Sequence, residues 1–443
     1  MSTPVLRVGI LGATDTAQAT YLPILHSDPT HFHLSIIYDP NPEVTQHCQA
    51  QFKIPYRTSV ADDVLRHAGI DLVLNLLPME DREQYTVAAL KAGKHVMVEA
   101  PLSLSIPGWQ HIRGAIKKRN ATTATGVTTQ SNGDTNNSVE SKNNPKIFVS
   151  CAYRYAPCFT EVFKKELASL DRIYYARCRN IAGAPSINPR PTTNGNKPTK
   201  NGTNGAATNP NTTAQFRALL ADVFGGPEED LTPDRAAFCR FLGTRGGHDL
   251  SLMRECLGLP DAVSSVSITV PFYSVVFHYT DTAGQGQGHP FTLLYEAGVD
   301  GVPRCDAHLT IYGANKTISV QYDFPCPGEV GSIEGLCVRV VVEEAEPDTA
   351  VCSGHGHING NGHGNGIASS WYTDSCARVK RTEIVSSADD AYRQELAALY
   401  SYLVEGNTAG KTDAGDALMD LRLLRLIFEH YNRQCGTIRT PLG

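Results

Sequence analysis

The first residues whose types and spacing suggest chemistry form a glycine turn near the start of the chain. Aligned with the pattern G-x-G-x-x-[GA], its key positions are Gly12, Thr14 and Ala17. The first glycine permits a tight turn, the middle position lets a pyrophosphate approach bare backbone, and the small third residue lets the helix pack on the strand. Thr14 departs from glycine at the middle position. An apolar strand precedes the turn and a helical pattern follows it, which is the context that a dinucleotide-binding turn requires.

An acidic residue stands at the end of the next strand. Asp39 follows the run IIY, no arginine comes directly after it, and a carboxylate there can accept hydrogen bonds from a ribose 2′-hydroxyl. We therefore expect NAD or NADP, with NAD favoured by Asp39, to be bound by Gly12, Ala13, Thr14, Ala17 and Asp39. The alternative is a plain strand–helix turn at Gly12, with Asp39 as the N-cap of the next helix.

Three further side chains could act on a substrate, namely Tyr153, Arg154 and His248. An imidazole with an unperturbed pKa near ~6.5 can move a proton at neutral pH. A phenol can donate to a carbonyl or enolate oxygen, and a guanidinium can counter negative charge. We expect these three residues to be catalytic, and for His248 this expectation depends on the resemblance of its segment, GTRGGHDLSLMRECLG, to a known family motif. The alternatives are a histidine that bonds backbone at a helix start and a packed corner at Tyr153 and Arg154.

The composition excludes several classes of partner. With 39 Lys+Arg against 45 Asp+Glu, the net charge of −6 provides no broad basic surface for nucleic acid. No apolar run approaches the ~18–20 residues that cross a bilayer, and the N-terminus lacks the features of a secretory signal. The twelve cysteines are scattered without a C-x-x-C pair, so we expect neither a disulfide framework nor a metal site. We expect a cytoplasmic protein that binds a small-molecule substrate.

The first 119 residues alternate between short apolar strands and helical patterns, which indicates βαβ units and a parallel sheet. The expected strands are Val5–Leu11, His33–Tyr38, Asp71–Leu77, His95–Val98 and Lys146–Tyr153, and the expected helices are Ala17–Leu25, Pro42–Phe52 and Arg82–Ala92.

From residue 172 onward, longer strands alternate polar and apolar side chains, which is typical of an antiparallel sheet with one solvated face. The expected strands span 172–181, 263–270, 272–280, 291–298, 308–313, 316–323, 337–346 and 377–385, and the chain closes with helices over Asp389–Glu405 and Asp413–Cys435. The fold class is therefore α/β, with an N-terminal Rossmann dinucleotide-binding domain and a C-terminal α+β domain with a large, mainly antiparallel sheet.

Three segments rich in Asn, Gly, Thr and Ser interrupt these patterns, at 120–145, 186–213 and 352–366. They contain too few aliphatic side chains to form a core, so we expect flexible insertions. The last contains His355, His357 and His363 among glycines, which favours a solvated loop over a metal site. We place the domain boundary after residue 150, giving domains 1–150 and 151–443.

The chain resembles the glucose–fructose oxidoreductase / inositol dehydrogenase / MocA (Gfo/Idh/MocA) family of NAD(P)-dependent oxidoreductases in several segments, in the family's order. These are RVGILGAT, YDPNPE, DLVLNLLP, VAALKAGKHVMVEAPLSLS, SCAYRYAPCFTEV, GTRGGHDLSLMRECLG and the C-terminal ALMDLRLLRLIFEHYNRQCGTIRTPL. The resemblance implies that Pro78, Glu99 and Pro101 contact the cofactor and that His248 faces it. It also implies that the C-terminal helix returns toward the first domain and that the protein forms a homo-oligomer through the open face of the large sheet.

The sequence departs from the family at three functional positions. The Glu-Lys-Pro signature, whose lysine is a cation beside the nicotinamide, is Glu99-Ala100-Pro101 here. The aspartate four residues before His248 is Thr244, although Gly246 and Asp249 are retained. The histidine four residues after Pro78 is Arg82.

These departures leave three functions open. The first is an NAD(P)-dependent oxidoreductase acting on a carbonyl, C=C or C=N group, since reduction of a conjugated bond demands less of an alkoxide-handling lysine. The insertions resemble those of filamentous-fungal proteins, which suggests, by analogy alone, a tailoring enzyme of secondary metabolism. The second is a non-redox isomerase, lyase or cyclase in the same kind of pathway. The third is a cofactor-sensing binding protein.

Overall fold

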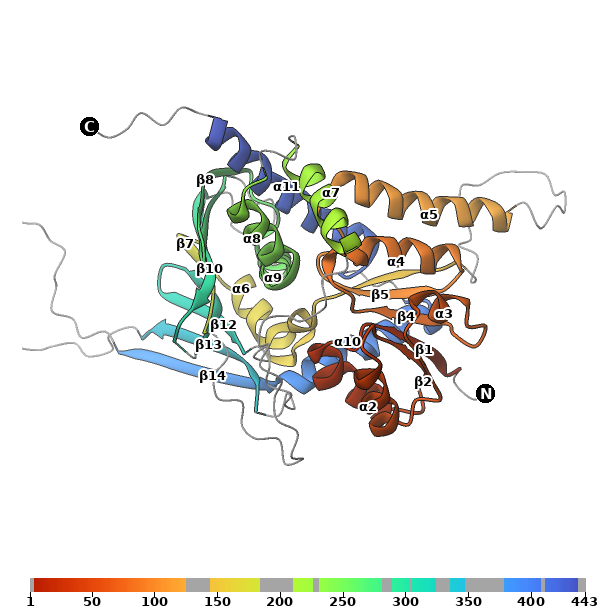
Figure 1. The fold of residues 1–443 in the computed structure, drawn as a ribbon. Helices are drawn as coiled ribbons and strands as arrows, with labels where there is room; N and C mark the ends of the chain where they lie inside the picture. Colours follow the sequence, from red (N-terminus) through yellow and green to blue (C-terminus); the bar gives the residue numbers. More distant parts are fainter. Residues whose placement is uncertain are drawn as a thin grey trace, which may run out of the picture.

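Two β-sheets organise the chain (Figure 1). The structure is a computed structural model that describes residues 4–124, 144–183, 210–225, 231–280, 289–302, 304–323, 335–346, 378–407 and 411–436. The first sheet is parallel and six-stranded, in the order β3-β2-β1-β4-β5-β6, and the second is eight-stranded, in the order β14-β13-β12-β11-β7-β10-β9-β8. This architecture confirms the expected Rossmann-type α/β fold and the large second sheet.

The parallel sheet is built by βαβ units, as the alternation of strands and helices predicted. Its strands are β1 (Leu6–Leu11), β2 (Phe32–Tyr38), β3 (Tyr56–Thr58), β4 (Leu72–Asn75), β5 (His95–Glu99) and β6 (Ile147–Ser150). Its helices are a π-helical turn at Ala17–Tyr21 that runs into α1 (Leu22–Ser27), then α2 (Pro42–Phe52), α3 (Ala61–Arg66), α4 (Met79–Lys91) and α5 (Ile106–Ala124).

Local sequence explains how these elements begin and end. In α2, the Asn41 side chain accepts from the N–H of Glu43 at 3.0 Å and Pro42 occupies the first helical position, so both start signals are present. The helix stops at Lys53, whose φ of 53° places it in the left-handed region. The N-cap is therefore Asn41, which removes the alternative role for Asp39 as the cap of this helix.

Helices cover both faces of the parallel sheet, and two of them come from the C-terminal part of the chain. On one face, Leu396 and Leu399 of α10 (Ala388–Tyr400) join the core formed by α1, α2 and the sheet. On the other face, Leu421 of α11 (Ala414–Gly436) packs with α3, α4 and α5. The C-terminal helices therefore lie against the sheet that carries the glycine turn.

The second sheet contains the strands that the polar–apolar alternation predicted. They are β7 (Tyr175–Gly183), β8 (Ala262–Thr269), β9 (Phe272–Tyr279), β10 (Phe291–Asp300), β11 (Cys305–Tyr312), β12 (Lys316–Tyr322), β13 (Cys337–Ala345) and β14 (Val379–Ser387). Every pairing is antiparallel except β7 with β10, which is parallel.

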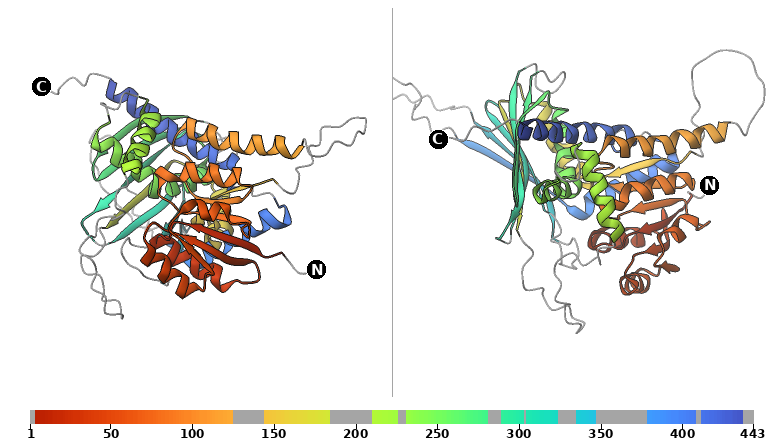
Figure 2. Two further views of the ribbon diagram at one scale, coloured as in Figure 1. Left: turned by 45° about the vertical axis from the view of Figure 1, so that its right-hand side comes forward. Right: turned by 45° about the horizontal axis from the view of Figure 1, so that its top comes forward.

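The face of this sheet that is turned toward the parallel sheet is covered by helices (Figure 2). They are α6 (Lys164–Ala168), α7 (Pro210–Phe224), α8 (Pro233–Phe241), α9 (Gly247–Leu257) and part of α11. Alternate side chains of the strands point into the core between the sheet and these helices, because successive residues of a strand face opposite sides.

The expected insertions begin and end differently from the prediction. Helix α5 continues through Ala124, so residues 120–124 are helical, and α7 begins at Pro210, inside the expected second insertion. The remainder of these two segments and all of 352–366, with its three histidines, lie outside the described residues. The boundary after residue 150 stays a prediction.

None of the described helices combines the length and the hydropathy that a membrane-spanning segment requires. Among the same residues, no group of three or more His, Cys, Asp or Glu side chains is arranged to bind a metal ion.

Candidate functional site

A cavity of about 240 Å³ lies where the carboxyl ends of β5 and β6 meet the start of α9. The carboxyl edge of an open parallel sheet is the place where such folds bind ligands. The lining residues are Thr16, Tyr21, Arg82, Glu99, Ala100, Ser150, Ala152, Tyr153, Thr244, Arg245, His248 and Tyr392. Of the residues expected to form the site, the structure therefore brings Glu99, Tyr153 and His248 together.

His248 stands in the first turn of α9, within the cavity lining. Burial, and then the positive charge of Arg82, lower the pKa of the imidazole to about 4. The sequence-based expectation of an unperturbed pKa is therefore wrong, because it ignored both the depth of the site and the neighbouring guanidinium. At neutral pH the ring is uncharged, so it can donate one N–H to a ligand and cannot release a stored proton.

Arg82 supplies a buried positive charge beside His248, and sequence analysis did not assign it a role. Its Nη1 donates to the carbonyl oxygens of Pro101 and Gly243, both at 3.3 Å, and its Nη2 lies 3.4 Å from Glu99 Oε2. The Nε–H is buried and has no hydrogen-bond partner among the described residues. The only signal in the sequence was the arginine four residues after Pro78, where the resemblance implied a histidine.

Glu99 is the partner of this arginine. Burial raises the pKa of its carboxyl group, and the charge of Arg82 lowers it in part. Ala100, at the position of the expected lysine, is almost fully buried and has no charge to contribute. A cation therefore reaches this end of the cavity from α4 instead of from the end of β5.

Tyr153 lines the cavity from the short 3₁₀ turn that follows β6, Ala152–Tyr155. Its hydroxyl donates to the carbonyl oxygen of Asp323 at 2.7 Å and is also hydrogen-bonded with Tyr392. Burial raises the pKa of Tyr153 well above its usual value, so the phenol stays protonated. Its hydroxyl can donate to a ligand only if it gives up the hydrogen bond to Asp323.

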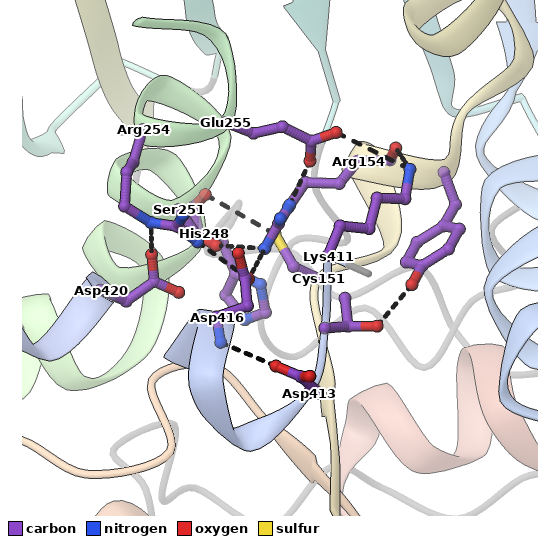
Figure 3. Close-up of polar contacts among 12 residues, drawn as sticks. Cys151, Arg154, His248, Ser251, Arg254, Glu255, Lys411, Asp413, Asp416 and Asp420 are labelled. Carbon is purple, nitrogen blue, oxygen red and sulfur yellow. Dashed lines mark hydrogen bonds and ion pairs between the residues drawn. The ribbon is translucent and has the colours of Figure 1, made fainter. Parts of the chain in front are cut away.

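Arg154 does not line the cavity and lies in a buried network of charges, shown in Figure 3. Its guanidinium pairs with Glu255, donates to Ser251 at 3.0 Å, and donates to Asp416 at 2.7 Å. Arg254 joins the same network through Asp416 at 2.8 Å. The structure therefore does not bring Arg154 to a ligand. The network instead fixes α9, which carries His248, against the start of α11.

We expect Arg154→Met to lower the free energy of unfolding by about 3 kcal/mol, because breaking a buried ion pair leaves charges without compensation. Breaking a buried ion pair costs about 3–5 kcal/mol in general. We expect a loss at the low end of this range because Glu255 keeps Lys164 and Lys411 as partners. Urea unfolding measures the change. The matched control is Arg425→Gln, whose exposed pair with Glu429 should contribute less than about 1 kcal/mol. Equal effects of the two variants would contradict a structural role for the network.

The glycine turn holds its expected geometry at the carboxyl end of β1. Gly12 has a φ of +94°, and a Cβ there would meet the Leu76 carbonyl oxygen at 3.0 Å, so only glycine fits without strain. The N–H of Ala13 donates to Asp39 Oδ2 at 3.0 Å. The Thr14 hydroxyl accepts from the N–H of Ala17 at 3.2 Å, at the start of the helix.

None of the four turn residues, and not Asp39 either, lines the cavity, but Thr16 and Tyr21 of the segment that follows Gly12 do. Pro78 directly precedes α4 and lies outside the cavity lining, and Pro101 contributes the carbonyl oxygen that Arg82 binds.

Two buried carboxyl groups near the cavity were not identified from the sequence as parts of a site. Asp249 accepts hydrogen bonds from Asn180, Tyr295 and Tyr322, which attach α9 to three strands of the second sheet, and burial raises its pKa to about 6. Glu395 lies on the buried side of α10 and is fully buried. In the sequence, Glu395 lies at helical spacing from apolar residues, and this position could have indicated that its side chain is buried.

The fold matches solved structures of oxidoreductases over nearly its whole length. It is similar to an oxidoreductase from Thermotoga maritima, at 15% identity, with 96% of each chain covered and a TM-score of 0.58. It is also similar to levoglucosan dehydrogenase in complex with NADH and levoglucosan, at 14% identity, with 97% of this chain and 98% of that chain covered and a TM-score of 0.59.

A third similar structure is a 3-ketoreductase from Actinomadura kijaniata in complex with NADP and TDP-benzene. The identity is 14%, the match covers 95% of this chain and 96% of that chain, and the TM-score is 0.58. At these identities the likeness concerns the fold alone. No curated protein sequence matches the chain.

The sequence of the first domain supplies the more specific comparison. Residues 6–127 match the profile described as an oxidoreductase family with an NAD-binding Rossmann fold. The matched segment spans β1 through α5 and includes the glycine turn, Asp39, Arg82 and Glu99. This N-terminal part of the chain therefore matches the Gfo/Idh/MocA oxidoreductase family, the family that the sequence resembles.

Proposed function

We propose that the protein is an NAD(P)-dependent oxidoreductase that reduces a carbonyl, C=C or C=N group of a small molecule bound in the cavity. One observation carries this proposal. The cavity joins the helix that follows the glycine turn to the neutral imidazole of His248 and the cation of Arg82. A cofactor bound along the turn and a substrate bound among these side chains would therefore be neighbours. A tailoring role in secondary metabolism and a homo-oligomeric state belong to the same proposal.

The turn fits a dinucleotide on its adenosine side. Gly12 adopts the positive φ of the motif, and Asp39 is held beside the turn by the N–H groups of Ala13 and Asn41, at 3.0 and 2.9 Å. A carboxylate oxygen can accept more than one hydrogen bond, so Asp39 can also receive a ribose hydroxyl. Its negative charge would repel a 2′-phosphate, which favours NAD over NADP. Thr14 leaves the pyrophosphate one backbone donor fewer, because the Thr14 hydroxyl already accepts from the N–H of Ala17.

A bound nicotinamide would supply or accept the hydride, and the chain's own side chains would handle the charge. The neutral His248 can donate a hydrogen bond to a substrate oxygen or nitrogen that gains negative charge. Arg82 stabilises the same charge electrostatically from its buried position. The tyrosine rings of Tyr21, Tyr153 and Tyr392 give the cavity aromatic walls suited to a planar, conjugated substrate.

We expect Gly12→Ala to abolish measurable NADH binding while the fold is retained. The added Cβ would meet the Leu76 carbonyl oxygen at 3.0 Å in a backbone conformation that alanine disfavours, so the turn must move. Calorimetric titration measures the affinity, and circular dichroism checks the fold. The control is Gly114→Ala in α5, where an added Cβ meets nothing within 4 Å. NADH affinity that survives Gly12→Ala would show that the turn does not hold the cofactor.

A non-redox isomerase, lyase or cyclase is the second candidate. Two features favour it, namely the neutral Ala100 at the position of the expected lysine and the Thr14 hydroxyl at the helix start. Both would follow from the loss of hydride transfer. A cofactor-sensing binding protein is the third candidate, and it would bind the dinucleotide without turnover.

The three functions separate in one assay. The protein is incubated with NADH or NADPH and a panel of ketones, conjugated enones and imines, while cofactor absorbance and product mass are followed together. Substrate reduction with matching loss of the reduced cofactor supports the oxidoreductase. A product of unchanged mass, or two fragments whose masses add up to that of the substrate, formed without cofactor oxidation, supports the isomerase, cyclase or lyase. Cofactor binding with no product from the panel supports the sensor.

A further inference from the structure

A carboxyl group that has no cationic partner among the described residues lies directly behind the cavity. Glu395 is completely buried, and its hydrogen bonds come from neutral groups. The N–H of Cys151 donates to Oε1 at 2.6 Å, the Ser150 hydroxyl lies 3.0 Å from Oε2, and the Tyr21 hydroxyl lies 3.3 Å from Oε2. Burying a carboxylate without a counter-charge is costly, so this environment favours the protonated acid.

The two hydroxyls connect this acid to the cavity. Tyr21 and Ser150 both line the cavity, and their oxygen atoms are 2.6 Å apart. Together with Glu395 Oε2 they form a closed triangle of hydrogen bonds. The ring of Tyr21 packs edge-on against Tyr392, with centroids 5.4 Å apart, which holds the phenol in place. A continuous hydrogen-bonded path therefore runs from a buried acid to the ligand space.

The charges around Glu395 agree with a protonated group. Burial raises its pKa to about 8, against the hydrogen bonds from Ser150, Cys151 and Tyr21, and the negative charge of Glu99 adds to the rise. The other titratable groups that interact with it are the phenols of Tyr21, Tyr155 and Tyr392 and the thiol of Cys151, and burial raises the pKa of each of these.

Proton storage is the function that His248 cannot perform. Its imidazole is neutral at neutral pH, so it can polarise a substrate but has no extra proton to release. Reduction of a C=O or C=N bond needs a proton as well as a hydride.

We propose that Glu395 is the proton reservoir of the cavity and that the hydroxyls of Ser150 and Tyr21 pass its proton to the substrate. This inference rests on the proposed function for the identity of the acceptor, an oxygen or nitrogen atom made basic during reaction. It does not depend on which nicotinamide cofactor is used.

The transfer balances without any further reactant. The O–H bond of Glu395 breaks as a new O–H bond forms at Ser150 Oγ, and the original Ser150 proton moves to the oxygen of Tyr21. The original Tyr21 proton forms the new bond to the substrate atom. No electrons leave the side chains. Glu395 ends as a carboxylate and regains one proton from water after product release.

Infrared difference spectroscopy on the free protein tests the reservoir without cofactor or substrate. A protonated, buried carboxyl group has a C=O stretching band that disappears on ionisation. We expect one such band to be lost with a midpoint near pH 8 in the wild type and to be absent from Glu395→Gln. Asp249 provides an internal reference, because its band should titrate near pH 6 and persist in Glu395→Gln.

Hydrogen–deuterium exchange of the same band tests the path. After transfer into D₂O, the double variant Ser150→Ala/Tyr21→Phe should slow the exchange of the Glu395 proton on the order of tenfold or more, because it removes both hydroxyls that join Glu395 to the cavity while the aromatic ring stays in place. Tyr392→Phe is the matched control. It removes a neighbouring hydroxyl that bonds Tyr153, and it should leave the exchange rate unchanged.

Two results would overturn the inference. One is the absence of a carboxyl band at neutral pH that titrates near pH 8, and the other is equal exchange in the double variant Ser150→Ala/Tyr21→Phe and the wild type. If Glu395→Gln does not fold, the wild-type titration and the exchange rate of Ser150→Ala/Tyr21→Phe still decide. A wild type that shows the expected band and exchange but binds no nicotinamide nucleotide would refute the proposed function and leave the reservoir standing.

Discussion

Replacing His248 by alanine is expected to lower kcat/KM by about 10²–10³, the usual effect of removing one donor that stabilises developing negative charge. The imidazole lies at the start of α9 inside the cavity, and burial and Arg82 keep it neutral. In the proposed function, its contribution is an N–H that binds the reacting oxygen or nitrogen most strongly as charge develops. Most of the loss should appear in kcat, because an interaction made mainly in the transition state changes kcat more than KM.

The matched variant His248→Gln separates hydrogen bonding from proton transfer. Glutamine keeps an N–H donor but cannot take up a proton, so it should recover part of the activity that alanine loses. The pH profile provides a second test. Since the pKa of His248 is lowered to about 4, its titration should affect activity only as the pH falls toward that value. Unchanged turnover in both variants would remove His248 from the mechanism.

Replacing Arg82 by glutamine is the second substitution with a large expected effect, again a loss of about 10²–10³ in kcat. The change removes the positive charge next to the reacting group and leaves Glu99 without its partner. It should also raise the pKa of His248, because the charge of Arg82 is the second cause that lowers it. Steady-state kinetics measure the first effect, and NMR titration of the imidazole measures the second.

Arg82→Lys keeps the charge but cannot reproduce the planar contacts to the carbonyl oxygens of Pro101 and Gly243. Its kcat should fall between those of the wild type and Arg82→Gln. The exposed Arg425→Gln again serves as a control for general effects of losing an arginine. If Arg82→Gln kept full activity and left the pKa of His248 unchanged, the guanidinium would have no part in the chemistry.

Much of the fold followed from periodicity, because periodicity reflects burial directly. Strands such as Phe272–Tyr279 alternate buried and less buried side chains, and that pattern is visible in the sequence. The parallel pairing of β7 with β10 was not predicted, since register and direction depend on which strands become neighbours after folding. Helix α5 was not among the predicted helices, and its last residues, 120–124, were assigned to an insertion because this Asn- and Thr-rich end resembles a loop in composition.

The site was harder to predict than the fold, and the reason is electrostatic. The sequence identified His248 but not its neutral state. That state arises from burial and from Arg82, which is distant in the sequence but close in the fold. Arg154 has the residue type of a substrate-binding cation, yet Glu255 and Asp416 neutralise it in the interior. The proposed role of Glu395 depends on its neutral partners Ser150 and Tyr21, which are far from it in the sequence. Composition and spacing identify residue types that are capable of chemistry, whereas the contacts of each side chain decide whether it is placed to act on a ligand.

The most direct test of the central claim is an equilibrium titration of the wild-type protein with NADH, NAD, NADPH and NADP. We expect saturable binding of a nicotinamide dinucleotide, with NADH and NAD preferred because Asp39 lies beside the glycine turn. Absence of binding by all four nucleotides to the folded protein would contradict it.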